Sequence, residues 1–99
     1  MALNGFDISA YQNGINLSAV PFDFMIRKTS EGTYHINPGA DDHIQQAISL
    51  GKLWGFYHYV AGSPDPVTEA DFWIDNTANY WGKGLPCIDW ERTGNAQFG

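Results

Sequence analysis

The sequence predicts an α/β fold built around a parallel sheet, and three observations carry this prediction. Four short segments have the composition of strands, and segments with helical periodicity lie between the later ones. Such alternation favours parallel strands joined by right-handed crossovers. Polar or ionisable residues also end every strand segment, as at the catalytic edge of a TIM-like β/α barrel. We therefore expect a barrel of this type, of which the chain supplies about the first four strands.

The four strand segments are rich in β-branched and aromatic residues. They are "GFDIS" (5–9), "DFMIRKT" (23–29), "LWGFYHYV" (53–60) and "LPCIDWE" (85–91). Between the first two, "NLSAVPFD" allows only a short helical turn, because Pro21 would interrupt a longer helix.

A first helix is predicted from "NPGADDHIQQAISLGK", which lies between the second and third strands. Asn37 can cap this helix and Pro38 fits its first position. Asp41 and Asp42 would lie in the first turn, where the helix dipole favours anions, and Gly51 is a typical stop. Its apolar residues have helical spacing: Ala40, Ile44, Ala47 and Ile48.

A second helix is predicted from about Pro66 to Trp81, with Asp65 as its cap and Gly82 and Gly84 closing it. One face would carry Ala70, Trp73, Ile74, Thr77 and Trp81. The segment 85–91 then follows as the fourth strand along the chain.

Composition and charge exclude several classes of function. The net charge of −6 disfavours binding to a nucleic acid backbone, and no stretch reaches the ~20 apolar residues of a membrane span. The beginning, "MALNGFDIS", lacks the basic and apolar regions of a secretory signal, so we expect a cytoplasmic location before any release. Cys87 is the single cysteine, which excludes an internal disulfide and a cysteine-rich metal site. We expect no metal and no cofactor.

The pair Asp89 and Glu91 is the main candidate for chemistry. Strand residues two apart point to the same face, with α-carbons about 6.6 Å apart. Repulsion between the two carboxylates would raise one pKa and leave a proton donor beside an anion, as glycosidic bond cleavage needs. The spacing fits both retaining and inverting geometries and does not choose between them. The alternative interpretation is a pair of solvated residues at a strand-to-loop boundary.

Several motifs in order resemble one enzyme family. "GFDISAYQ", "FDFMIRKTSEGTY", "GFYHYV" with "TEADFW" downstream, and "LPCIDWE" are similar to glycoside hydrolase family 25. These are the Chalaropsis-type lysozymes, including bacterial and phage endolysins that cut peptidoglycan between N-acetylmuramic acid and N-acetylglucosamine. The resemblance runs from about Gly5 to Glu91.

The resemblance implies roles for particular residues. Glu91 matches the general acid, and Asp89 matches the neighbouring carboxylate, which is either the nucleophile or the group that orients the substrate's N-acetyl. Asp7 matches an active-site aspartate in the D-x-S motif of the first strand. Lys28, Glu31 and Tyr57 resemble groups that line the substrate groove. Independently of the family, aromatic rings can stack on sugars, which makes Tyr11, Tyr34, Tyr57 and Tyr59 candidate walls.

The family's catalytic domain is roughly twice as long as this chain. We therefore expect residues 1–99 to form the N-terminal half of such a domain, completed by a C-terminal half or by self-association. The expected partner is the peptidoglycan glycan strand, at the cell wall or outside the cell.

Other interpretations stay open at this point. Asp7 could cap the following turn, and Lys28 could be a surface residue. His58 is expected to be a hydrogen-bonded barrel histidine, and His35 and His43 are expected on a loop and a helix surface. Two other functions compete: a non-catalytic glycan-binding or regulatory fragment, and a metal-dependent hydrolase with four ligands, Asp7, His58, Asp89 and Glu91.

Overall fold

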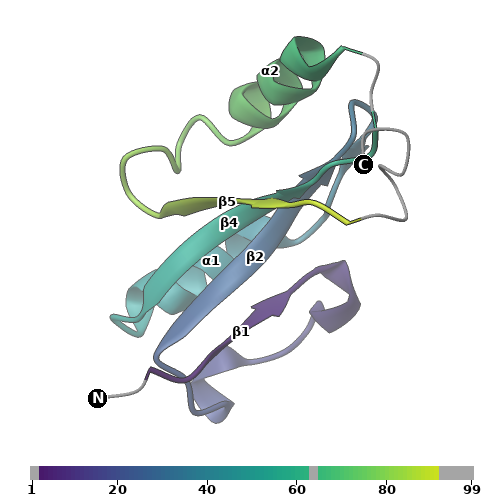
Figure 1. The fold of residues 1–99 in the computed structure, drawn as a ribbon. Helices are drawn as coiled ribbons and strands as arrows, with labels where there is room; N and C mark the ends of the chain where they lie inside the picture. The colour runs from purple at the N-terminus through teal and green to yellow at the C-terminus, as the bar shows by residue number, and fades with distance from the viewer. Residues whose placement is uncertain (1–2, 63–64, 92–99) are drawn as a thin grey trace.

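The computed structural model describes residues 3–62 and 65–91 (Figure 1). Five strands alternate with two 3-10 turns and two α-helices. The strands are β1 (Gly5–Ile8), β2 (Phe24–Glu31), β3 (His35–Ile36), β4 (Leu53–Tyr59) and β5 (Leu85–Asp89). The turns are η1 (Ala10–Gln12) and η2 (Leu17–Ala19), and the helices are α1 (Ala40–Ser49) and α2 (Pro66–Asn76).

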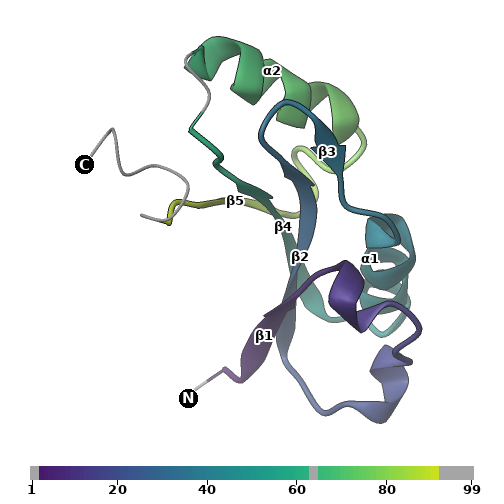
Figure 2. The same ribbon diagram turned by 90° about the vertical axis from the view of Figure 1, so that its right-hand side faces the viewer.

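The sheet has the order β1-β2-β4-β5, and these four strands are parallel. The short strand β3 pairs antiparallel with the end of β2 and lies off this path. Figure 2 shows both helices on one side of the sheet, and both contact β2. The predicted parallel α/β architecture is confirmed. Strand β3 was not predicted, because two residues are too short to show an alternating pattern.

The core lies between the sheet and the two helices. Phe56 is fully buried, with its ring centroid 5.7 Å from that of Trp73 on α2. Burial of such a side chain contributes about 1.5–3 kcal/mol. The buried hydrophobic residues are Ile8, Leu17, Phe22, Met25, Ile44, Ala47, Phe56 and Trp73. The opposite face of the sheet, which neither helix covers, is available for a functional site (Figure 2).

Helix α1 begins later than the sequence predicts. Gly39 is its N-cap, with a φ of 82°, and Ala40 is its first residue. Asn37 is not the cap, because its side chain is buried and accepts hydrogen bonds from the Ala10 N–H and the Arg27 guanidinium. Pro38 lies before the helix, with its carbonyl accepting from Arg27. The buried Arg27 side chain therefore binds oxygens of Asn37 and Pro38, the two residues that the sequence predicts to start the helix.

Helix α2 begins as predicted, with the Asp65 side chain accepting from two backbone N–H groups, but it ends at Asn76 rather than near Trp81. Its buried face was predicted only in part. Trp73 and Thr77 are buried, whereas Ala70 and Ile74 are exposed. The core-facing position belongs to Glu69, because its carboxylate contacts the buried His58 ring at 2.8 Å.

A bulge in β2 changes which way its last residues point. The register between β2 and β4 shifts between Lys28 and Ser30. Thr29 and Ser30 are consecutive and both buried, so Lys28 and Glu31 come to the same face and form an ion pair. In a regular strand, residues three apart would point to opposite faces.

Among the described residues, neither helix is long and apolar enough to cross a lipid bilayer.

Candidate active site

Three carboxylates line one pocket on the open face of the sheet. Asp7 comes from β1, Asp89 is the last residue of β5, and Glu91 lies two residues beyond it. The pocket has a volume of about 400 Å³. Its other lining residues are Ile26, Tyr57, Cys87 and Ile88. Residues that are 82 positions apart in the chain are thus brought together at the strand ends.

Strand alternation explains why these side chains share a face. On β1, Ile8 is buried and Phe6 packs edge-on against Phe22, with ring centroids 5.2 Å apart, so Asp7 between them points to the open face. On β5, Asp89 aligns with Tyr59 of β4. The Asp89 carbonyl accepts from the Val60 N–H at 3.0 Å, which anchors the end of the strand.

The two neighbouring acids interact directly. A side-chain hydrogen bond with Asp89, and then the negative charge of Asp89, raise the pKa of Glu91 above its usual range. The Lys28 ammonium acts in the opposite direction on the same group. The arrangement favours the protonated form of Glu91 more than an isolated carboxyl group would, as a proton donor requires.

Tyr57 lines the pocket from β4, which lies between the two strands that carry Asp7 and Asp89. Burial, followed by the charges of Asp7 and Asp89, raises the pKa of Tyr57 to about 12. The ring therefore carries a neutral hydroxyl at neutral pH, able to donate a hydrogen bond toward a ligand in the pocket.

The remaining residues of the predicted groove do not all lie in the pocket. Lys28 and Glu31 form an ion pair of 2.7 Å beside it, and the Tyr34 hydroxyl donates to Glu31 at 2.7 Å. Tyr11 on η1 is 94% exposed and does not line the pocket. Its contact with substrate, like the roles of the other site residues, stays a prediction.

His58 lies on the helix-facing side of the sheet. Its Nδ1 atom is 2.7 Å from the Ser30 hydroxyl, and its Nε2 atom is 2.8 Å from the Glu69 carboxylate. Both ring nitrogens are thus engaged within the core, as expected for a barrel histidine. His58 is also absent from the pocket that holds Asp89, which argues against a shared metal site for these residues.

Sequence reasoning missed a polar cluster around Arg27. This side chain is fully buried and donates to the side chains of His43, Asn37 and Asn13. His43 is buried as well, so its predicted position on the helix surface is wrong. Strand alternation could have indicated that Arg27 is buried, because Arg27 shares its face of the strand with the buried Met25.

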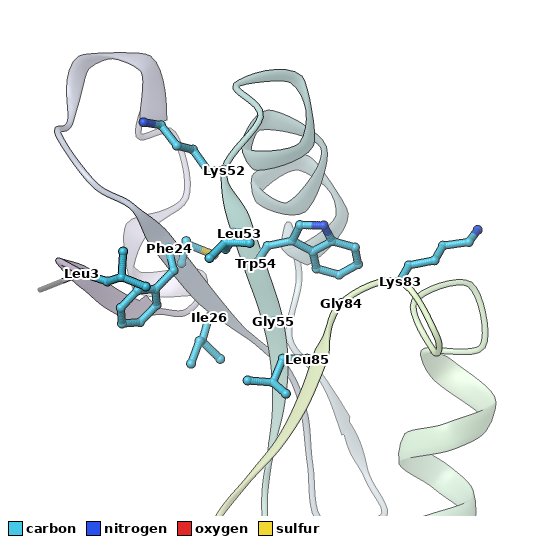
Figure 3. A pocket seen from close by; sticks show the side chains of 11 residues that line it. Leu3, Phe24, Ile26, Lys52, Leu53, Trp54, Gly55, Lys83, Gly84 and Leu85 are labelled. Atoms are coloured by element: carbon cyan, nitrogen blue, oxygen red, sulfur yellow. The ribbon is translucent and has the colours of Figure 1, made fainter. Parts of the chain in front are cut away.

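A second, larger pocket occupies the other end of the open face (Figure 3). It has a volume of about 570 Å³ and an apolar lining that includes Leu53 and Leu85, which are 62% and 61% exposed. We call this the apolar floor. Its lining residues are Leu3, Phe24, Met25, Ile26, Lys52, Leu53, Trp54, Gly55, Lys83, Gly84 and Leu85. No carboxylate lines it, so the floor offers packing surface rather than acid chemistry.

A parallel β/α sheet with paired carboxylates at its strand ends is an arrangement typical of glycoside hydrolases of the barrel class. Comparison with known families is specific. The family model for glycosyl hydrolases family 25 matches residues 6–98, and the chain belongs to this family.

Three relatives illustrate the similarity. The N,O-diacetylmuramidase of Chalaropsis sp is 30% identical, over 84% of this chain and 43% of that protein. The family GH25 lysozyme from Aspergillus fumigatus is 27% identical, with a TM-score of 0.71 over 98% of this chain and 51% of that one. The catalytic domain of an endolysin from a Listeria monocytogenes bacteriophage shares the fold, with 23% identity and a TM-score of 0.74 over 91% of this chain and 48% of that one. The chain spans about half the length of these relatives.

Proposed function

We propose that this chain is the N-terminal half of the catalytic domain of a peptidoglycan-cleaving lysozyme, an N-acetylmuramidase. The reaction is hydrolysis of the bond between N-acetylmuramic acid and N-acetylglucosamine. The observation that carries the proposal is the pocket that Asp7 shares with the hydrogen-bonded pair Asp89 and Glu91. Membership of the family and the similarity to a named muramidase support the choice of substrate.

In the proposed reaction, Glu91 donates its proton to the oxygen of the leaving sugar. As the glycosidic bond breaks, Asp89 either attacks the anomeric carbon or orients the N-acetyl group of the substrate while positive charge develops on the ring. Water, deprotonated by Glu91 now acting as base, then adds to the anomeric carbon and completes the hydrolysis. Asp7 approaches from the opposite edge of the pocket and positions the substrate or adds negative charge. The hydrogen bond between Asp89 and Glu91 supports this division of roles, because it raises the pKa of Glu91 and so favours the proton on the group assigned as donor.

The decisive variant is Glu91→Gln, which keeps the shape of the side chain but cannot donate an acidic proton. In the complete catalytic domain, we expect it to lower the release of reducing ends from purified peptidoglycan by at least about 10²-fold. Binding to peptidoglycan in a pull-down should persist. Asp71→Asn, on the exposed side of α2, is the matched control and should keep the wild-type rate. Wild-type hydrolysis by Glu91→Gln would contradict the assignment.

A second candidate is a peptidoglycan-binding or regulatory fragment without catalysis. The exposed apolar floor favours it, because the open face of the sheet is only partly covered. Retention on peptidoglycan with no reducing ends released by the wild-type chain would support this candidate. Release of reducing ends by the 99-residue chain would exclude it.

We also propose that the apolar floor packs against a second half-barrel, which a second copy can supply to the isolated chain. The described sheet has β1 at one edge and β5 at the other, and all its main strands are parallel. A two-fold axis along the barrel would pair β5 of each copy with β1 of the other in parallel, closing an eight-stranded sheet. The exposed Leu53 and Leu85 would then be buried.

The proposed place of action is the bacterial cell wall, where peptidoglycan is found. The similarity to a muramidase and the shared fold with an endolysin catalytic domain support this location.

A further inference from the structure

The Lys28–Glu31 ion pair lies beside the candidate acid pair without lining its pocket. Lys28 Nζ is 2.7 Å from Glu31 Oε1, and Tyr34 Oη donates to Glu31 Oε2 at 2.7 Å. The ammonium also lies 5.1 Å from the centroid of the Tyr59 ring, within range of a cation–π contact. Glu31 and Tyr59 therefore hold the lysine from two directions.

The bulge in β2 creates this pair, and α2 holds the bulge. At the register shift, the Thr29 hydroxyl donates to the Tyr57 carbonyl at 3.0 Å and accepts from Trp73 Nε1 at 3.2 Å. A side chain thus takes over a bond in the sheet ladder. A position held by both a neighbouring strand and a helix is well suited to set a charge near a catalytic group.

We propose that Glu31 is a positioning residue, which holds the Lys28 ammonium over Tyr59 and away from the Asp89–Glu91 pair, so that Glu91 keeps its proton. The inference rests on the proposed function, since it assigns Glu91 the role of proton donor.

The distances make this restraint necessary. Only β4 separates β2 from β5, and Glu31 is level with Asp89 through Tyr59, so the backbones at these two residues lie about 10 Å apart at a spacing of ~4.8 Å per strand. The Lys28 ammonium, held over Tyr59, therefore lies over the strand next to the one that ends in Asp89. Lys28 already counteracts the raised pKa of Glu91 from its present position. Without the Glu31 charge, the attraction between Lys28 and the acid pair would no longer be balanced by this ion pair.

The other charged and titratable groups near this region do not replace Lys28. Asp7 lines the pocket from β1 and Tyr57 lines it from β4, whereas Tyr59 lies further along β4. The pKa values of both tyrosines are raised, first by burial. His35 on β3 and Glu69 on α2 act on the Glu31–Tyr34 contact rather than on Glu91. The pKa of Glu31 is itself lowered, first by its hydrogen bond with Lys28, so it stays ionised and keeps its hold.

The test is an NMR titration of the Glu91 side-chain carboxyl in the 99-residue chain. Glu31→Gln preserves the acceptor for Tyr34 but removes the charge that holds Lys28. We expect the Glu91 midpoint to fall by about 1 pH unit, because an opposite charge within ~4–6 Å favours the ionised form. In the double variant Glu31→Gln/Lys28→Met, the midpoint should rise above that of Glu31→Gln.

Tyr34→Phe is the matched control, because it removes the other partner of Glu31 and leaves the ion pair in place. Its Glu91 midpoint should stay at the wild-type value. An unchanged midpoint in Glu31→Gln, or the same lowered midpoint in the double variant, would overturn the inference.

The titration does not depend on activity, so it separates this inference from the proposed function. A lowered midpoint in Glu31→Gln, combined with wild-type hydrolysis by Glu91→Gln, would retain the electrostatic inference and reject the catalytic role. Where hydrolysis is measured, Glu31→Gln should move the basic limb of the kcat/KM profile to lower pH, because the donor loses its proton earlier.

Discussion

Replacement of Arg27 by methionine should destabilise the fold, because the substitution leaves buried hydrogen-bond acceptors without a donor. The guanidinium is fully buried and donates five hydrogen bonds, all to neutral acceptors. Two of these acceptors keep another donor in the variant: Asn37 Oδ1 retains the Ala10 N–H and the Pro38 carbonyl retains Asn13 Nδ2. The cost therefore falls mainly on the other acceptors.

The magnitude follows from the buried acceptors that lose Arg27. His43 Nδ1 and the Lys28 carbonyl each lose a bond, of 2.8 Å and 2.6 Å, and an unsatisfied buried group costs about 1–3 kcal/mol. Burial of the methionine side chain offsets about 2 kcal/mol of this loss. At a mid-range cost of about 2 kcal/mol for each acceptor, we expect the free energy of unfolding to fall by about 2 kcal/mol, measured by urea denaturation.

A second readout tests the same reasoning. Burial and then the positive charge of Arg27 lower the pKa of His43 in the wild-type chain. Without that charge, the pKa of His43 should rise toward its ordinary value, which an NMR titration of the ring can follow. Asp75→Asn, on the exposed surface of α2, is the matched control and should stay within about 0.5 kcal/mol of wild type. A similarly small effect of Arg27→Met would refute the account of the buried cluster.

The remaining predictions concern pH and assembly. Because the pKa of Tyr57 is raised to about 12 in the folded state, the unfolded chain loses this proton first as pH rises through about 10. Its contribution to stability should therefore be lost between about pH 10 and 12, and Tyr57→Phe should reduce that loss in alkaline urea titrations; an unchanged pH dependence would contradict it. The wild-type chain should have the mass of a dimer in light scattering, and Leu53→Glu/Leu85→Glu, which puts charge on the apolar floor, should be monomeric. A monomeric wild-type chain at concentrations of order 100 µM would rule out pairing between copies.

Local patterns were enough to locate most elements. Alternation and composition predicted the four parallel strands to within about two residues at their ends, because side-chain parity is a local property of a strand. The Asp65 cap and its helix start were predicted for a similar reason, since a cap is a contact over two or three residues. Local patterns could not reveal that Arg27, on another element, binds the oxygens of Asn37 and Pro38 and so sets where α1 begins.

The same division applies to the candidate site. Parity on one strand predicted that Asp89 and Glu91 share a face. That Asp7 lines the same pocket depends on how the sheet curves across β2 and β4 between β1 and β5. The bulge that turns Lys28 and Glu31 to one side depends on a hydroxyl bond to β4 and an indole bond from α2.

The amino-acid sequence alone determined the order of strands and helices and the two acids that neighbour each other, because both follow from contacts between residues close in the chain. The tertiary structure decided which distant charges act on those acids. It also decided which polar groups, such as Arg27, His43 and Glu69, are enclosed in the core. The physical reason is that burial and electrostatic interaction depend on distance through space, which strand pairing and helix packing set only once the chain has folded.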